Sequence, residues 1–397
     1  LPEGGTRAWL SVLGVWLVQF ANYGYTNAYG VYNDYYVRIY LNDRPASDSS
    51  WIGSVQWSFS LIVGLWTGRI FDQGYFYHLM AFGSFLSVFS LFMLSLSQPH
   101  QYYQIFLSQG VGLGLGIGIV YAPSLGLISH YFNRRRPLAL TLAVSGTGLG
   151  GMIHPILLNA LIYSKLGFAG AVRVSAALDA VLLIAALLLM RPRYGHKQGA
   201  ALQARHVGFW TNLKNFYTDP PFVFTSLGLF ISSLSILFPT YFLQLNAIKR
   251  GIDPKLAFYT LTMLNGTNFL GRLLSAPIID WFGPFNSMTA TTFCCAVLIF
   301  ALQGITDAVG TVVFALLYGF FAGIYGGIAA PLISSLASDR SEVGARIGIC
   351  WTAASISGLV GSPIAGWLLG RDFKWTRPIA FSGVRGFWVL HLETLLT

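Results

Sequence analysis

Residues 253–283 read DPKLAFYTLTMLNGTNFLGRLLSAPIIDWFG, and this stretch decides the fold because it places an arginine inside an apolar run. Asp253 and Pro254 match the N-cap and first-turn residues of a helix. About 24 mostly apolar residues follow before Asp280, which is enough to cross the hydrocarbon core of a bilayer. We therefore expect a transmembrane helix here.

Arg272 lies inside this predicted span, about 12 Å of helix rise from its nearer end at roughly 1.5 Å per residue. A charge at such depth costs about 3 kcal/mol unless it faces a partner or water. Asn268 and Asn265 precede it by four and seven residues, on the same helical face. We interpret Arg272, Asn268 and Asn265 as substrate-binding residues that line a cavity. The alternative is that Arg272 only holds a neighbouring helix through its backbone carbonyls.

The composition is that of a polytopic membrane protein. Of the 397 residues, 54% are hydrophobic and 10% are charged, whereas a soluble domain carries about 25% charge. The net charge of +10 comes from short basic loops between apolar runs. These loops form no continuous basic face, so we expect no nucleic-acid partner. The first residues are polar and the apolar run after them is too long for a signal-peptide core, so we expect no cleavable signal.

Apolar runs of spanning length define the domain organisation. They lie at 9–32, 51–70, 77–97, 102–129, 138–163, 170–190, 221–245, 256–279, 286–306, 309–336 and 344–369. A twelfth run at 378–397 is interrupted by Arg385, His391 and Glu393. We predict an all-α membrane protein with an N-terminal six-helix bundle at 1–190, a cytoplasmic linker at 191–220 and a C-terminal bundle at 221–397. Whether the twelfth helix is complete or truncated stays open.

Basic residues set the expected orientation. The first-half loops on one side hold Arg7, Arg69, Arg134, Arg135, Arg136 and the basic linker, and the opposite loops hold Arg38, Arg44, Lys165 and Arg173. Cytoplasmic loops collect Lys and Arg, so the N-terminus is predicted inside. We expect a multi-pass protein of the plasma membrane.

The two halves repeat a pattern at the predicted cytoplasmic face. The second span is followed by Gly64, Gly68, Arg69, Asp72 and Gly74, and the eighth by Pro277, Asp280 and Gly283. Each helix end turns through a glycine beside an acid, which a neighbouring helix N-terminus can hold until the halves move. We predict a gating motif formed by Gly64, Gly68, Arg69, Asp72 and Asp280.

Further polar residues fall within predicted spans. Asn22 and Asn27 suit a cavity wall that offers hydrogen bonds, as does Tyr121, although tyrosines near span ends also form interfacial belts. His154 can contact a solute or titrate, or it can be a satisfied buried histidine. Asp179 can carry a proton, or form an ion pair or polar contact. Lesser candidates are Tyr25, Tyr29, Tyr32, Asn33, Asp34, Ser232, Ser235, Tyr241, Gln244, Tyr318, Tyr325 and Trp351.

Glycine-rich segments favour helix packing over nucleotide binding. Residues 146–151, GTGLGG, match a dinucleotide-binding pattern, but that fold needs a preceding strand and an acid about 20 residues later, and neither is visible. We expect close contact between helices through these small residues, and likewise through the alternating glycines of 110–118. The sequence holds no HExxH and no Cys/His cluster, and no span carries paired carboxylates. We therefore predict no enzyme activity, no cofactor and no metal site.

The order of several short motifs resembles a known family. They are Glu3-Gly4-Gly5 with Ala8-Trp9, residues 51–56 (WIGSVQ), Gly64 with Gly68-Arg69 and Asp72, residues 131–136 (YFNRRR), Arg191-Pro192, Gly271-Arg272, and residues 361–366 (GSPIAG). Together they resemble the major facilitator superfamily and, within it, the monocarboxylate-transporter-like branch, especially its fungal members. The resemblance implies a major facilitator fold of two pseudo-symmetric six-helix bundles and a secondary transporter.

Two positions depart from the proton-coupled lactate-type members of that branch. Those members place a lysine in the first span, where Val31 stands, and an aspartate where Asn268 stands. The family's proton relay therefore does not transfer directly. We predict a transporter that moves a small organic solute, a carboxylate or similar polar compound, by alternating access. The alternatives are a non-transporting nutrient sensor of the same fold and an efflux carrier for a secondary metabolite. The expected partners are the solute, the lipid bilayer and, as a further hypothesis, protons.

Overall fold

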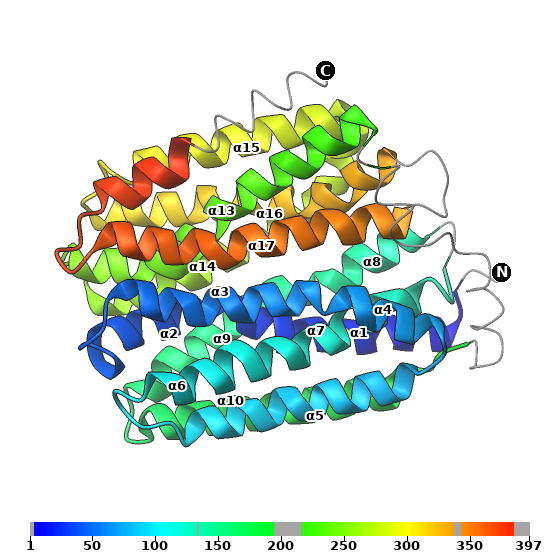
Figure 1. The fold of residues 1–397 in the computed structure, drawn as a ribbon, viewed down its shortest axis with the longest axis horizontal. Helices are drawn as coiled ribbons and strands as arrows, with labels where there is room; N and C mark the ends of the chain where they lie inside the picture. The colour runs from blue at the N-terminus through cyan, green and yellow to red at the C-terminus, as the bar shows by residue number, and fades with distance from the viewer. Residues whose placement is uncertain (1–3, 133–134, 194–215, 217, 337–342, 385–397) are drawn as a thin grey trace. The chain divides into compact units, whose positions relative to one another are not determined.

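The computed structural model describes residues 4–132, 135–193, 216, 218–336 and 343–384. The side chains of Arg69, Asp72, Pro137 and residues 343–345 are outside this description. Every regular element in the described residues is a helix (Figure 1). Eight helical stretches of the described residues, some made of more than one helix, are long and apolar enough to cross a membrane. The predicted all-α membrane fold is confirmed.

Contacts within the chain define two compact units. The first is formed by described residues within 1–28 and 55–206. Its helices are α1 (Thr6–Asn27), the end of α3 (Ala46–Ile62), α4 (Gly64–Asp72), α5 (Phe76–Ser95), α6 (Tyr102–Ile105), the π-helical η2 (Phe106–Leu113), α7 (Gly114–Ile128), α8 (Arg136–Val144), α9 (Gly146–Ile162) and α10 (Gly167–Leu189). In this unit α1 packs against α9 and α10, and α5 packs against α7 and α10.

The second unit is formed by described residues within 29–54 and 207–397. Its helices are α2 (Tyr29–Tyr35), the π-helical η1 (Tyr36–Tyr40), the start of α3, α13 (Pro220–Lys249), α14 (Pro254–Phe282), α15 (Pro284–Ala301), α16 (Ala308–Ser335) and α17 (Val343–Leu369). Here α14 packs against α16, while α13 packs against α17 and α2. The part of the predicted first span that begins at Tyr29 thus belongs, by its contacts, with α13.

All eleven predicted apolar runs coincide with helices. The predicted N-cap is confirmed, since the Asp253 side chain accepts a hydrogen bond from the backbone N–H of Lys255 at 3.5 Å. The first run is broken near Ala28 and then continues to Tyr40. Residues 376–384 are helical, and the rest of the predicted twelfth run lies outside the described residues. So does most of the predicted linker at 191–220, and the predicted domain limits stay predictions.

Glycines allow the closest helix contacts. A Cβ added to Gly24 on α1 would lie 2.6 Å from the Cα of Gly150 on α9, and one on Gly116 of α7 would lie 2.5 Å from Ser87 Oγ on α5. Neither approach is open to a larger residue without movement of a helix. The predicted role of 146–151 and of the 110–118 glycines in close packing is confirmed.

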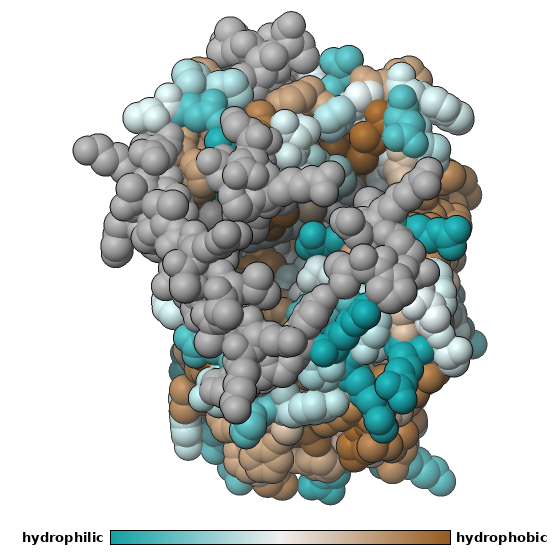
Figure 2. Space-filling model, turned by 90° about the vertical axis from the view of Figure 1, so that its right-hand side faces the viewer, coloured by the Kyte–Doolittle hydropathy of each residue, from teal (hydrophilic) through white to brown (hydrophobic). Residues whose placement is uncertain are grey.

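Large apolar side chains remain exposed on the helices. Trp281 is 77% exposed and Trp367 is 72% exposed. On the face drawn in Figure 2, hydrophobic side chains line much of the lower and right-hand edge, and hydrophilic ones gather nearer the middle. Such exposure is unfavourable in water and is expected where lipid covers the helices.

Candidate functional site

Arg272 lies half-buried on α14 and its Nε donates a hydrogen bond to Asn268 Oδ1 at 3.0 Å. Its guanidinium lies over Gly326 of α16, where an added Cβ would be 3.2 Å from Nη2. Asn265, two turns earlier on the same helix, is 3% exposed. A guanidinium carries five N–H donors, so it can bind Asn268 and an anionic or strongly polar group together. The structure therefore brings Arg272 and Asn268 into contact, as their spacing predicts.

A second group of residues, which includes the predicted Asn22, Asn27 and Tyr121, surrounds the end of α1 in the first unit. The Tyr23 hydroxyl donates to Ser60 Oγ at 3.0 Å, and the rings of Tyr23 and Tyr121 have their centroids 4.5 Å apart. Asn22, next to Tyr23, is 4% exposed, and its Nδ2 has no hydrogen-bond partner among the described residues. Asn27 is half-buried at the last residue of α1. Polar donors and aromatic faces thus gather at this end of the first helix.

His154 on α9 and Asp179 on α10, predicted separately, are neighbours. The distance from His154 Nε2 to Asp179 Oδ1 is 3.6 Å, and their side chains are 0% and 4% exposed. The His154 ring also packs against Phe20 and Tyr25 of α1, with centroid distances of 5.4 Å and 5.3 Å. A backbone group of Phe20 also lies within hydrogen-bonding reach of the ring. The pair therefore lies at the junction of α1, α9 and α10.

The polar atoms of this pair are poorly bonded. Within the described part of the chain, Oδ1 of Asp179 has no hydrogen-bond partner, and neither ring nitrogen of His154 forms a hydrogen bond of normal distance and angle, although a backbone group of Phe20 lies within reach of the ring. A separation of 3.6 Å is longer than a normal hydrogen bond. Buried polar groups are nearly always bonded, so each exception calls for an explanation.

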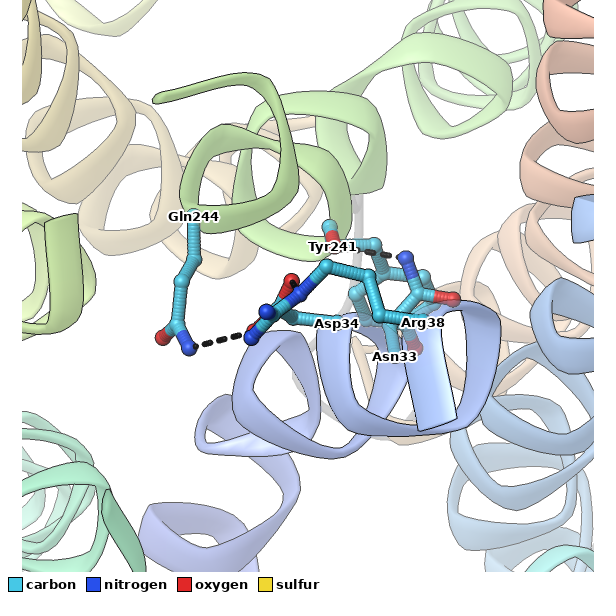
Figure 3. A network of polar contacts seen from close by, with 5 residues as sticks. All are labelled: Asn33, Asp34, Arg38, Tyr241 and Gln244. Atoms are coloured by element: carbon cyan, nitrogen blue, oxygen red, sulfur yellow. Dashed lines mark hydrogen bonds and ion pairs between the residues drawn. The ribbon is translucent and has the colours of Figure 1, made fainter. Parts of the chain in front are cut away.

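A third group, in the second unit, contains a buried acid whose oxygens are well bonded (Figure 3). Arg38 donates from Nε and Nη2 to the two carboxylate oxygens of Asp34, at 2.5 Å each. Gln244 Nε2 on α13 donates to Asp34 Oδ2 at 3.1 Å. The Asp34 side chain is fully buried, and that of Arg38 is 23% exposed. A bidentate pair of this kind fixes both side chains.

Further bonds tie α2 to α13 next to Asp34. Asn33 Nδ2 donates to the Tyr241 carbonyl at 2.8 Å, and the Tyr241 hydroxyl donates to the Gly53 carbonyl at 3.0 Å. Ser49 Oγ donates to Asn33 Oδ1 at 2.8 Å. We call Asn33, Asp34, Arg38, Tyr241 and Gln244 the Asp34 network. Sequence reasoning assigned Arg38 to an outer loop and missed the pair, although four-residue spacing of opposite charges was the available signal.

Another ion pair has no signal in a single sequence. Arg346 of α17 is 4% exposed, and its Nη1 lies 2.7 Å from Oδ2 of Asp219, the residue just before α13. The guanidinium also lies over the rings of Phe216 and Phe222, at 4.6 Å and 5.2 Å from their centroids. Partners so far apart in the chain meet only through the fold.

The predicted gating motif is described in part. Gly64 begins α4, Gly68 lies within α4, and Asp280 is exposed near the end of α14. The predicted glycine turns are confirmed, because Gly74 has φ +92° and Gly283 has φ +77°. The side chains of Arg69 and Asp72 lie outside the described residues. The motif's role in gating stays a prediction.

Comparison with known proteins places the chain in a family. The model of the Major Facilitator Superfamily matches residues 13–362. The aspyridones efflux protein apdF of Emericella nidulans is 35% identical over 370 residues, 93% of this chain and 73% of the relative. An agnestins efflux protein of Paecilomyces divaricatus is 35% identical over 91% of this chain and 81% of its own length. The MFS-type transporter dbaD of Emericella nidulans is 36% identical over 96% of this chain and 84% of its own. This chain belongs to the major facilitator superfamily.

A solved structure supports the same fold. The crystal structure of a mutant of the nucleoside transporter NupG is similar with a TM-score of 0.73 and 15% sequence identity, over 96% of this chain and 99% of that one. At this identity the likeness concerns the fold alone.

These findings confirm a multi-pass membrane transporter and narrow the predictions. The family and the relatives are transporters, which agrees with the expectation that the chain is not an enzyme. The relatives' names do not single out the monocarboxylate-transporter-like branch, and none indicates a carboxylate solute. The names that specify an activity describe efflux, which favours the alternative prediction over the main one.

Proposed function

We propose that this protein exports a secondary metabolite across the plasma membrane by alternating access. The observation that carries this proposal is that two relatives, each 35% identical across more than nine-tenths of the chain, are named efflux proteins. The earlier preference for a carboxylate solute is set aside, since no relative's name supports it.

Two groups of side chains are the proposed solute contacts. In the second unit, Arg272 presents a charged donor held by Asn268, with Asn265 on the same helix. In the first unit, Tyr121 with Asn22 and Asn27 offers an aromatic face and amide groups. Hydrogen-bond donors beside ring faces suit an organic molecule that carries both oxygen atoms and apolar rings. The role of each residue is a proposal that transport measurements can test.

The test is transport by purified protein in liposomes, with aspyridones, agnestins and lactate as probes. We expect wild-type protein to move the aspyridones or the agnestins faster than protein-free liposomes do, and lactate no faster. Arg272→Ala should lower the rate about 10- to 100-fold, because a hydrogen bond to a charged group contributes about 1.5–3 kcal/mol. Arg371→Ala is the matched control, since Arg371 is exposed just after α17.

Two results would count against the proposal. Movement of lactate without either of the larger probes would restore the carboxylate interpretation. Transport by Arg272→Ala at the wild-type rate would show that Arg272 is not a solute contact. It would not contradict the proposal that the protein is an exporter.

A further inference from the structure

The His154–Asp179 pair is a buried acid–base pair that the proposed solute contacts do not require. Both side chains are essentially inaccessible, and they face each other across the α9–α10 contact at 3.6 Å. Asp179 Oδ1 has no hydrogen-bond partner among the described residues, and the His154 ring has only a backbone group of Phe20 within hydrogen-bonding reach besides Asp179. A structural pair is normally bonded on all sides, so this one is poorly suited to a purely structural role.

The number of protons on the pair decides its net charge. With one proton the pair is neutral overall, either as imidazolium and carboxylate or as imidazole and carboxylic acid. A second proton leaves a net positive charge, and loss of the single proton leaves a net negative charge. An uncompensated charge inside a membrane protein costs several kcal/mol. While the junction is dry, the pair therefore retains one proton, and the two sites titrate as a unit.

The surroundings contain no competing counter-charge for the pair among the described residues. From α1, the Tyr25 ring packs on His154, while Tyr23 donates to Ser60 and Arg7 is exposed. On α10, Arg173 donates from Nε to Ser95 Oγ of α5 at 3.3 Å. The remaining titratable groups on neighbouring segments are exposed: Tyr77 and His78 on α5, Arg135 and Arg136 at α8, and Tyr163 and Lys165 after α9. The charge on the pair is thus governed by its own proton and by water.

The helices around the pair meet through glycine. Gly24 of α1 lies against Gly150 of α9, one turn before His154, and Gly146 lies against the Trp16 carbonyl of α1. At these glycines the backbones meet without interlocking side chains, so a shift of α1 against α9 requires repacking mainly where the rings of Phe20 and Tyr25 contact His154. A shift of α1 against α9 would admit water to His154, because the ring of His154 packs on α1.

We propose that His154 and Asp179 form a proton-binding site that exchanges its proton only when the α1–α9–α10 junction hydrates. The site couples proton movement to the conformational cycle of the carrier. This inference rests on the proposed function for its physiological meaning, because coupling needs a transported solute. Proton binding itself can be measured without one.

The first experiment measures proton binding by infrared spectroscopy of the purified, reconstituted full chain. Wild-type protein is expected to show a protonated-carboxyl C=O band whose intensity titrates with pH. Asp179→Asn should remove that band, and His154→Gln should shift its midpoint by about one pH unit or more, because the base that shares the proton is gone. Asp34→Asn is the matched control: it removes another buried aspartate, one that accepts two hydrogen bonds from Arg38, and should leave the titrating band in place.

The second experiment measures coupling with the aspyridones as probe. A pH gradient is imposed in the direction that accelerates wild-type transport, and each protein's rate is divided by its own rate without a gradient. The ratio should fall to about one in His154→Gln and Asp179→Asn, and Asp179→Glu should restore part of it. A merely structural role would lower both rates together and leave the ratio unchanged.

The outcomes separate the two proposals. If wild-type protein moves none of the probes but the infrared band behaves as expected, the export proposal fails and the proton site stands. A titrating band that persists in Asp179→Asn, or an unchanged gradient ratio in both variants, overturns the proton site. Only variants that elute as a single folded species in size-exclusion chromatography are compared. If Asp179→Asn does not fold, the result for His154→Gln decides the test.

Discussion

Two buried aspartates with basic neighbours lie in very different surroundings. Asp34 accepts two hydrogen bonds from Arg38 and one from Gln244, and the residues beside it are bonded in turn (Figure 3). Asp179 faces His154 at 3.6 Å, and its Oδ1 has no hydrogen-bond partner among the described residues. The carboxylate of Asp34 is held by three hydrogen bonds, and Oδ1 of Asp179 is held by none among the described residues.

The difference indicates which acid can change its charge during transport. A carboxylate whose oxygens are bonded to Arg38 and to Gln244 is fixed in place, so the Asp34 network is expected to hold α2 on α13. A pair with unused donors and acceptors loses little when its proton moves. We therefore assign a mechanical role to the first and a proton-binding role to the second.

The largest expected effect comes from breaking the Asp34 network. Arg38→Ala should lower stability by about 3–5 kcal/mol, because it leaves a fully buried carboxylate without its ion partner. The measurement is thermal unfolding in detergent. Arg44→Ala is the control, since Arg44 forms a more exposed pair with Asp48, four residues later, at 3.3 Å. Such surface pairs contribute about 0–1 kcal/mol. An equal loss of stability in Arg38→Ala and Arg44→Ala would show that the buried pair stabilises the fold no more than the exposed one.

The opposite result is expected when the His154–Asp179 pair is replaced by apolar residues. The double variant His154→Leu with Asp179→Leu should be as stable as wild type, or more stable by up to about 4 kcal/mol, because two incompletely bonded polar groups leave the interior together. His154→Leu alone should cost about 1–3 kcal/mol, since the acid stays behind. A double variant less stable than the single one would show that the pair is structural.

The glycine contact between α1 and α9, beside the His154–Asp179 pair, offers a test of local packing. Gly150→Ala should cost about 1–3 kcal/mol, because its Cβ would meet the backbone of Phe20 and Gly24. Gly68→Ala in α4 should instead add roughly 0.5–1 kcal/mol, since nothing lies within 4 Å of its Cβ. Unfolding midpoints of the two variants are compared under one condition. Stabilisation by Gly150→Ala would mean that α1 and α9 are not in contact there.

The smallest effect concerns the hydroxyl of Tyr23. Tyr23→Phe removes the bond to Ser60 and keeps the ring contact with Tyr121. The expected loss is about 0.5–1.5 kcal/mol. Tyr77→Phe, at a residue 49% exposed, should be neutral. The measurement is thermal unfolding of both variants. A lower stability for Tyr77→Phe than for Tyr23→Phe would contradict a stabilising role for the Tyr23 hydroxyl.

The fold was largely predictable because each membrane-spanning helix corresponds to an apolar run in the sequence. The Asp253 N-cap, the glycine turns at Gly74 and Gly283, and the close packing of 146–151 also follow from local chemistry. The contact of Arg272 with Asn268 follows from a spacing of four on one helix.

The contacts that the sequence did not predict join residues on different helices. His154 and Asp179 were each recognised as unusual, but nothing in one sequence states that α9 and α10 bring them together. Arg346 and Asp219 are the stronger case, since each reads as an ordinary residue at the end of a span. The Asp34–Arg38 pair lay within reach of the spacing rule, and its tie to Gln244 did not.

The most direct test of the proton assignment is to follow protons and probe in the same liposomes. A trapped pH-sensitive dye reports proton movement while aspyridones are added to wild-type protein, Asp179→Asn and Asp34→Asn. We expect a pH change with the wild type that is lost in Asp179→Asn and persists, scaled to the remaining transport, in Asp34→Asn. A pH change that accompanies aspyridone movement equally in wild type and Asp179→Asn would contradict the assignment of the proton to this pair.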